Sequence, residues 1–420
     1  MKKKVFLAVL FFCLTVVSGT VYGGTNPEEA NTYVVIFKDE QLPADYKSEI
    51  TGRGGRIVSA NEAIGTVLIE AQDAGFIEKI KRNAKVEDSG LAGYVKPDML
   101  NWIEVNKESL SAAESYYDEY QWDIKRVGGN PETWAIEDGD HSVVIGVIDT
   151  GVDKTHPDIM DNYLYGKSLL AEFPDAGEDL IGHGTFVAGE IAGNGMIKGV
   201  APGLGIASYR VFGLEALTSI SVVSQAIVTA ANDGVDILNL SLGSLVDLAD
   251  PSMRAQYKEF LRAVLYAERK GVIIVTSSGN EALNLDKTGR IRSLPGEFPG
   301  VITVSATTNT DKLAFYSNYG ASIIDYCAPG GDMGPNYIPD DLSTVDWSYA
   351  CFGIVPGGYA YTVGTSVAAP KVTGVLGLIK SHFPKMINAR LLIKLRNATE
   401  NIGKRVYFGN GLINAQLAFD

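Results

Sequence analysis

The chain has 420 residues, of which 46% are hydrophobic and 20% charged, and its formal net charge is −14 at pH 7. This is the composition of a globular protein, and the length favours two folded units over one. No block of basic residues follows the N-terminus, which argues against nucleic-acid binding through a basic face.

The first residues have the pattern of an export signal. Three lysines at positions 2–4 precede an apolar run from Val5 to Val17, and small residues follow. The run is too short to span a bilayer comfortably, so we expect cleavage rather than anchoring. The sequence therefore predicts a signal peptide over residues 1–24 and a secreted, extracellular protein with no membrane anchor after cleavage.

A small α+β unit is predicted next, over residues 25–97. Extended segments alternate in it with short helical ones; the strands are expected at 33–37, 56–58, 66–70 and 86–88, and the helices at 43–52 and 72–82. Residues 98–119 are polar and rich in Glu, Ser and Tyr, a composition typical of an exposed linker. We therefore predict a processing linker there.

From residue 120 to residue 420 the pattern is that of an α/β domain. Near-continuous apolar runs suit a parallel sheet covered on both faces; they lie at 143–149, 206–212, 235–240, 272–276 and 301–306. Helical patterns lie at 183–193, 218–233, 252–270, 366–382 and 387–398. The alternation predicts right-handed crossovers between parallel strands.

Three segments of this domain hold one Asp, one His and one Ser in settings that suit nucleophilic catalysis. Asp149 ends an apolar strand, where sites in α/β sheets gather. His183 begins a helix of small residues and has the best setting for a base among the four histidines. Ser366 begins another helix, whose N-terminus favours a developing oxyanion. Singly, a turn Asp and a helix-capping Ser are ordinary, but a serine nucleophile needs both a base and a group that orients it.

Two further segments follow predicted strands. Asn280 comes after the strand at 272–276, and its side-chain amide could donate a hydrogen bond to an oxyanion. The backbone of Ser241, Leu242 and Gly243 could pair with an extended peptide. A loop Asn is the ordinary alternative for the first of these.

Together these segments resemble the motifs of the subtilisin-like serine proteases. The matching stretches are 147–151, 183–189, 199–202, 278–280 and 364–370. The resemblance covers residues from about 121 to 420, and residues 33–97 resemble the family's inhibitory propeptide. It implies a subtilisin-like parallel sheet with helices on both faces, and an acyl-enzyme mechanism. The implied roles are Asp149 as the group that orients the base, His183 as general base and acid, Ser366 as nucleophile, Asn280 as oxyanion donor, and residues 241–243 with the region 212–217 as groove walls.

The segments 364–372 and 327–332 resemble more narrowly the lantibiotic (lanthipeptide) leader peptidases, which trim a leader from a modified precursor peptide. A general extracellular endopeptidase is the alternative. We expect a peptide or protein substrate, with the propeptide as an intramolecular inhibitor. Arg292 falls where the family builds the floor of its main specificity pocket, so it could pair with an acidic side chain before the scissile bond; a solvated loop Arg is the alternative.

Other functions fit less well. An inactive, peptide-binding pseudoprotease stays open, although no catalytic position is substituted. An α/β-hydrolase esterase expects Gly-x-Ser-x-Gly, but residue 368 is Ala, and the glycines at 193–199 miss the dinucleotide-binding spacing.

No cofactor is needed for the predicted chemistry. Structural calcium is conceivable because Asp158 stands where many subtilisins bind it, but the stretch from His183 to Gly199 is short, so no metal ligand is assigned. Cys327 and Cys351 could form a disulfide in an oxidising compartment, or they could be two unrelated buried thiols.

Overall fold

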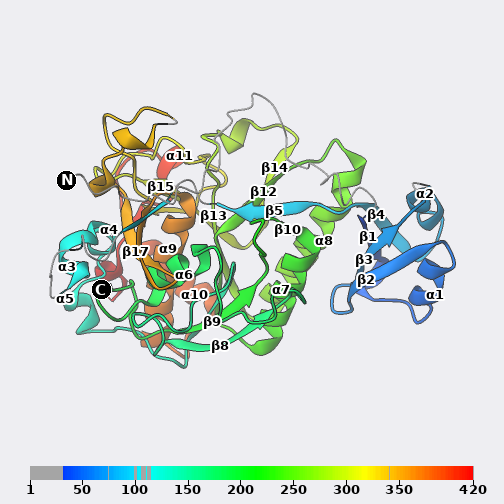
Figure 1. Cartoon of the computed structure of the whole chain (residues 1–420), viewed down its shortest axis with the longest axis horizontal. Helices are drawn as coiled ribbons and strands as arrows, with labels where there is room; N and C mark the ends of the chain where they lie inside the picture. The colour runs from blue at the N-terminus through cyan, green and yellow to red at the C-terminus, as the bar shows by residue number, and fades with distance from the viewer. Residues whose placement is uncertain are drawn as a thin grey trace, which may run out of the picture.

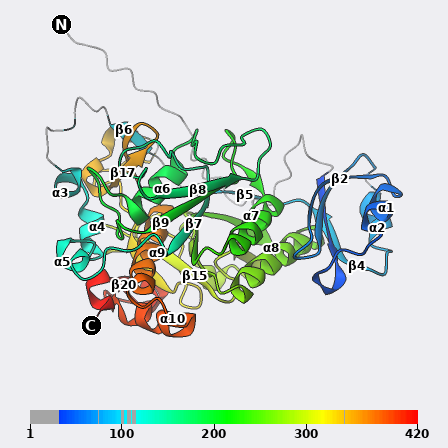
Figure 2. The same cartoon turned by 90° about the horizontal axis from the view of Figure 1, so that it is seen from below.

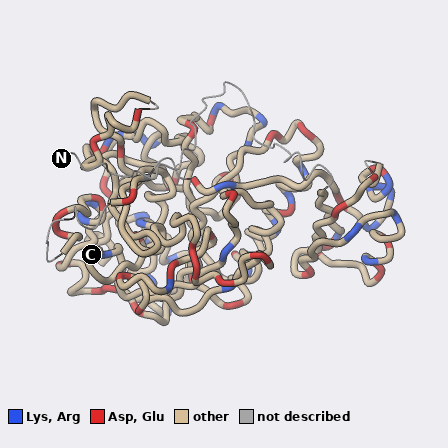
Figure 3. The backbone as a smooth tube through the Cα atoms, viewed as in Figure 1, with Lys and Arg blue, Asp and Glu red and all other residues tan. Residues whose placement is uncertain are grey.

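The structure, a computed structural model, describes residues 32–73, 75–98, 102–105, 110, 115–339 and 341–419. The predicted signal peptide lies outside these residues. Within the part described, no helix combines the length and apolarity needed to cross a membrane. Acidic and basic residues are interspersed over the described part of the molecule (Figure 3).

Residues 32–91 form a small α+β unit (Figure 1), which we call the prosegment body after the propeptide that the sequence predicts there. Its antiparallel sheet has the order β2-β3-β1-β4, with β1 at Thr32–Phe37, β2 at Gly55–Asn61, β3 at Thr66–Ala71 and β4 at Val86–Leu91. Helices α1 (Tyr46–Thr51) and α2 (Phe76–Ile80) complete the unit. Val35 and Phe37 of β1 belong to the unit's own core, whereas Val34 and Ile36 pack with Ala255 of the larger domain. This double burial explains why β1 is apolar at every position from Val34 to Phe37.

The larger domain is built on a nine-stranded sheet with the order β19-β20-β16-β15-β13-β11-β7-β9-β8. All pairings within it are parallel except that of β19 with β20. The strands are β7 (Val144–Asp149), β8 (Tyr163–Ser168), β9 (Gly205–Arg210), β11 (Ile237–Leu240), β13 (Ile273–Ser277), β15 (Val301–Thr307), β16 (Tyr326–Pro329), β19 (Thr399–Glu400) and β20 (Leu412–Ile413).

Helices cover both faces of this sheet (Figure 2), which confirms the predicted fold class. One core contains α6 (His183–Ala192), α9 (Thr365–His382) and α10 (Asn388–Asn397); the other contains α7 (Ile220–Asp233) and α8 (Pro251–Arg269). In β7, Ile145 and Val147 face the first core and Ile148 the second. The shorter helices are α3 (Tyr116–Tyr120), α4 (Trp122–Arg126), α5 (Pro131–Trp134) and α11 (Arg405–Phe408).

Several strands were not predicted from the sequence. β8 lies at the edge of the sheet, and its residues are only half-buried or exposed, so it carries no apolar run. β5 (Tyr94–Pro97) enters a second sheet of order β10-β5-β12-β14, with β10 at Thr218–Ser219, β12 at Leu242–Asp247 and β14 at Ile291–Leu294.

The linker prediction for residues 98–119 is wrong in part. Asp98 is only 4% exposed. Residues 102–105 form β6 (Trp102–Val105), which pairs with β18 (Gly358–Thr362) in a three-stranded sheet with β17 (Cys351–Val355). The polar composition of residues 98–119 as a whole concealed this short apolar segment, which pairs with β18 and whose Val105 packs against the larger core.

Candidate active site

The end of strand β7 and the start of helix α6 bring Asp149 and His183 together. Asp149 is the last residue of β7 and His183 the first of α6. The carboxylate oxygen Oδ1 of Asp149 lies 2.7 Å from Nδ1 of His183, and both residues are buried. The same oxygen accepts a hydrogen bond from the backbone N–H of Thr150. An imidazole held in this way by a carboxylate has a fixed tautomer and orientation, with Nε2 left for chemistry.

A second buried carboxylate, that of Asp179, holds the start of α6. It accepts hydrogen bonds from the backbone N–H groups of Ile181, Gly182 and Thr185, at 2.8–3.0 Å. Burial raises the pKa of Asp179, although these hydrogen bonds oppose the shift. Burial lowers the pKa of His183, but the carboxylates around it, Asp149 foremost and Asp179 among them, outweigh burial and raise that pKa overall. The imidazolium form that arises during acid–base catalysis is therefore stabilised.

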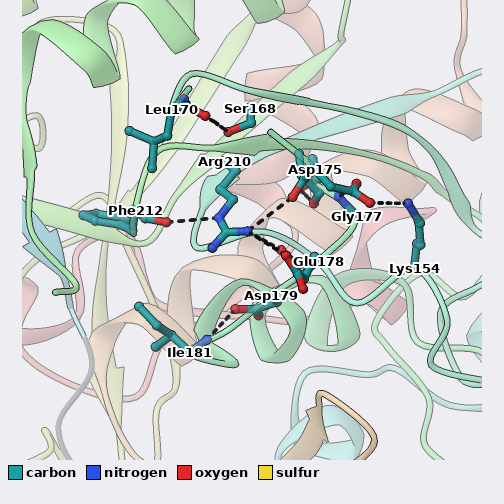
Figure 4. A network of polar contacts seen from close by, with 12 residues as sticks. Lys154, Ser168, Leu170, Asp175, Gly177, Glu178, Asp179, Ile181, Arg210 and Phe212 are labelled. Carbon is teal, nitrogen blue, oxygen red and sulfur yellow. Dashed lines mark hydrogen bonds and ion pairs between the residues drawn. The ribbon is translucent and has the colours of Figure 1, made fainter. Parts of the chain in front are cut away.

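The loop that leads into α6 is held by Arg210, at the end of β9 (Figure 4). Its guanidinium is buried and donates hydrogen bonds to the carbonyl oxygens of Phe212, Asp175 and Glu178. A buried cation that satisfies three carbonyls gives the loop a single arrangement. Sequence reasoning missed Arg210 and Asp179 because neither lies in a recognisable motif.

Ser366 and Asn280 lie together at the start of α9. The Oγ atom of Ser366 and Nε2 of His183 are both buried, and neither has a hydrogen-bond partner among the described residues. The side-chain oxygen Oδ1 of Asn280 accepts from the N–H and the hydroxyl of Thr365, both at 2.9 Å. These bonds turn the amide nitrogen of Asn280 towards the space in front of Ser366.

Asp98 occupies that space. Its carbonyl oxygen accepts a hydrogen bond from Nδ2 of Asn280 at 2.7 Å and one from the N–H of Ser366 at 3.4 Å. A methyl group placed on Gly364 would lie 2.9 Å from this carbonyl oxygen and 3.0 Å from Ser366 Oγ, so the two atoms border one small space. Two donors on one carbonyl oxygen at a helix N-terminus form the arrangement that stabilises an oxyanion.

The chain before Asp98 lies between β10 and β12 as an added strand; we call this strand position the groove (Figure 1). In the groove Leu242 faces Pro97 and Gly243 faces Lys96, and the N–H of Asp98 donates to the carbonyl of Ser241 at 3.0 Å. The structure thus places the predicted wall, residues 241–243, beside an extended peptide. On the other side Thr218 and Ser219 pair with β5, just after the predicted region 212–217.

Arg292 does not reach this peptide. Its guanidinium donates to the carbonyl oxygens of Gly289 and Ile291, and it lies 3.5 Å from the Glu297 carboxylate. The acidic side chain in the groove, that of Asp98, is bound by Ser277 instead. Arg292 therefore does not pair with Asp98 as predicted for an acidic residue before the scissile bond, because acceptors nearer to it hold its guanidinium.

Behind the two catalytic helices lies a buried ionic cluster. Lys371 of α9 is fully buried and forms ion pairs with Asp123 of α4, at 2.8 Å, and with Glu190 of α6. Burial raises the pKa of Glu190 to about 8, although Lys371 opposes the shift. The cluster joins the helices that carry His183 and Ser366.

The remaining polar candidates have structural contacts. Asp158 accepts hydrogen bonds from the N–H of Ile197 and the hydroxyl of Tyr359. Cys327 and Cys351 are free, buried thiols in separate hydrophobic clusters, so the possible disulfide is not formed.

The fold and the site together define a serine hydrolase with a groove for an extended peptide. Comparison with known proteins identifies its family. The Subtilase family (Peptidase S8) matches residues 140–411. The nisin leader peptide-processing serine protease NisP of Lactococcus lactis subsp. lactis is 30% identical over 389 residues, which are 83% of this chain and 55% of that protein. M-protease of Shouchella clausii is 30% identical over 396 residues, 93% of this chain and 92% of the relative.

A crystal structure of the epidermin leader peptide processing serine protease EpiP from Staphylococcus aureus is also similar. Its TM-score is 0.79 at 25% identity, and the match covers 92% of this chain and 97% of that one. The chain therefore belongs to the subtilase family of serine endopeptidases.

Proposed function

We propose that this chain is a secreted serine endopeptidase that removes leader peptides from lanthipeptide precursors. The observation that carries the peptidase activity is the Asp98 carbonyl oxygen, held between the Asn280 amide and the Ser366 N–H. The leader-peptide substrate is supported by the relatives, since two of those described above are leader peptide-processing proteases by name.

In this mechanism Ser366 Oγ attacks the carbonyl carbon of the scissile bond and passes its proton to His183 Nε2. The new oxyanion is stabilised by Asn280 and the N–H of Ser366. His183 then gives the proton to the departing amine, so that the C–N bond breaks and an acyl-enzyme remains. Water deprotonated by His183 hydrolyses the ester and restores the Ser366 hydroxyl. Asp149 stays hydrogen-bonded to His183 Nδ1 and stabilises the imidazolium throughout.

The prosegment would inhibit this site until it is released. Its tail, β5 with Asp98, fills the groove that a substrate would need, and its body packs on α8. A peptide that is already in place for attack can be cut by the site it blocks. We therefore infer that maturation is self-cleavage followed by dissociation of the prosegment.

Mass spectrometry of the purified protein beside a Ser366→Ala variant tests this proposal. We expect the wild type to separate into prosegment and peptidase domain, and the variant to remain one chain with an unchanged circular dichroism spectrum. The matched control is Ser305→Ala, because the Ser305 hydroxyl, on β15, is bonded to the carbonyl of Tyr407 in α11 and not to a residue of the site. Processing of purified Ser366→Ala at the wild-type rate would contradict the mechanism.

A second function, general extracellular proteolysis, is favoured by M-protease, which matches 93% of this chain. The matured enzyme should be offered a lanthipeptide precursor and casein at equal mass concentration. Cleavage confined to the leader junction supports the leader peptidase; degradation of casein at a comparable rate supports the general protease.

A further inference from the structure

We propose that the chain cuts itself between Asp98 and Met99, and that the pocket around the Asp98 side chain selects substrates with an aspartate before the scissile bond. This inference rests on the proposed peptidase function and names the substrate class of its site. The space around the Asp98 side chain, called here the Asp98 pocket, is bordered by Ser277 and Gly243.

The cleaved bond follows from the backbone contacts of Asp98. Its N–H is bonded to Ser241 O at 3.0 Å, and its carbonyl oxygen to Asn280 Nδ2 at 2.7 Å. The carbonyl that lies in the oxyanion site is the one that Ser366 can attack. The nitrogen bonded to that carbonyl carbon is the one of Met99, so the amine that leaves is the new N-terminus at residue 99.

The side chain of Asp98 is bound as specifically as its backbone. It is buried, and its Oδ2 accepts a hydrogen bond from the Ser277 hydroxyl at 2.6 Å. A Cβ on Gly243 would lie 3.2 Å from this Oδ2 and 3.2 Å from the carbonyl oxygen of Leu294. The carboxyl group therefore lies so close to Gly243 that a methyl group there would be a tight contact, and the Ser277 hydroxyl donates to it. A longer or branched apolar side chain would fill the Asp98 pocket and leave the Ser277 hydroxyl unpaired.

No cation neutralises Asp98: among the described residues none forms an ion pair with it, since Lys96 points to Glu281, 3.9 Å away, and Arg292 is held elsewhere. Glu281 is bonded to Asn318 on the other side. Burial, followed by the charge of Glu281, raises the pKa of Asp98 to about 7, against the opposing effects of Ser277, Lys96 and His183. Selection then depends on hydrogen bonding and size, and near neutral pH a protonated acid is an accepted occupant.

The test uses the matured wild-type enzyme and a peptide series. Each peptide keeps residues 94–97 and Met99 of this chain and carries Asp, Asn, Leu or Arg at the position of Asp98. We expect kcat/KM to be higher for Asp than for Leu or Arg by roughly ten- to hundred-fold, the cost of leaving the buried hydroxyl of Ser277 unpaired. Asn, which has the same shape, should be cut within about tenfold of Asp at pH 7.

Two outcomes distinguish a failure of the aspartate selectivity from a failure of the peptidase function. Faster cleavage after Arg or Leu than after Asp overturns the selectivity and leaves the peptidase function intact. Cleavage of none of the peptides, by a preparation that has not processed itself either, overturns the proposed function as well.

Two further measurements on the full chain test the assigned bond and the role of Ser277. The mass of the released prosegment should place its C-terminus at Asp98, and a different C-terminus overturns the assigned bond. Ser277→Ala should lower the ratio of Asp to Leu cleavage by about tenfold or more. Ser305→Ala, which removes a buried hydroxyl on the neighbouring strand β15, should leave that ratio unchanged; an equal ratio in both variants overturns the role of Ser277.

Discussion

The prosegment meets the peptidase domain at two places that are built from different interactions. In the groove the contacts are mostly main-chain ones: β5 pairs with β10 and β12, and the Asp98 carbonyl is held by Asn280. On α8 the contacts are side-chain ones, from Arg262, Glu259 and Lys258 to the prosegment body.

The groove contacts therefore account for inhibition of the active site, and the α8 contacts for retention of the prosegment after cleavage. Main-chain pairing is available to any extended peptide, so substrates can compete for the groove and the tail can be cut there. The α8 contacts depend on residues of this prosegment alone, so they should hold the body in place after the cut. The variants below are designed to change one contact and spare the other.

The largest effect is expected in the groove, from Asn280→Ala. Self-processing should slow by roughly a hundred- to thousand-fold, a range that comes from loss of the corresponding donor in a related subtilisin. The contacts of the prosegment body with α8 should be unaffected, because the prosegment residue that Asn280 bonds is Asp98, in the groove. The measurement is the rate at which the full-length band disappears after refolding. Asn232→Ala, which removes an exposed partner of Tyr266, is the matched control; equal slowing in both would contradict the role of Asn280.

On α8 the corresponding variant is Arg262→Met. The buried guanidinium donates to the carbonyls of Phe37 and Ile64 and pairs with Glu87. Its loss removes this donor from the two carbonyls and leaves Glu87 with Lys258 as its remaining cation, so the cleaved prosegment should bind about 2 kcal/mol or more weaker. Size-exclusion chromatography of the self-cleaved complex measures this loss: a larger fraction of the prosegment should separate from the peptidase domain than in the wild type. Retention equal to that of the wild type would show that the groove alone holds it.

The sequence was sufficient to predict the strands and helices that a local pattern of apolar residues determines. Five apolar runs became β7, β9, β11, β13 and β15, with ends shifted by up to two residues. Asp149 and His183 could be singled out because each ends or begins such an element. Their 2.7 Å contact follows from neighbouring parallel strands and a crossover helix, a placement that the fold class implies.

What the sequence did not reveal depends on partners distant along the chain. Asp98 was assigned to a linker because its burial comes from Ser277, 179 positions away. Arg292 was expected to pair with an acidic substrate side chain before the scissile bond, but its guanidinium is held by Gly289, Ile291 and Glu297, its neighbours in sequence. A charge in a sequence predicts that a partner exists, not which of several partners is nearest.

A smaller effect should come from pH, through Glu259. This buried α8 carboxyl is bonded to the hydroxyls of Thr66 and Ser221, and burial raises its pKa to about 7 against their opposing effect. A raised pKa means that the docked complex binds a proton which the separated parts release. Docking is therefore strongest below the ordinary pKa of a glutamic acid and weakens as pH rises towards 7, by at most about tenfold per pH unit for this group.

Asp98 adds to the same dependence, because its pKa is also raised to about 7. Retention of the cleaved prosegment should be measured at pH 5, 6, 7 and 8. Glu259→Gln, a neutral isostere, should bind the prosegment more tightly than the wild type at pH 8 and equally at pH 5. Stronger docking of the wild type at pH 8 than at pH 5 would contradict the assigned direction.

The smallest effect is expected from Arg269→Met, at the edge of the α8 contact. Arg269 lies 2.8 Å from the carboxylate of Glu40, but the two side chains are 52% and 37% exposed. Solvent screens such a pair, so its loss should weaken prosegment retention by about 1 kcal/mol or less. Raising the salt concentration from about 0.05 to 0.5 M should remove even this difference, while the effect of Arg262→Met persists because its acceptors are buried carbonyls. If salt alone releases the prosegment from the wild type, exposed charges rather than Arg262 hold the body on α8.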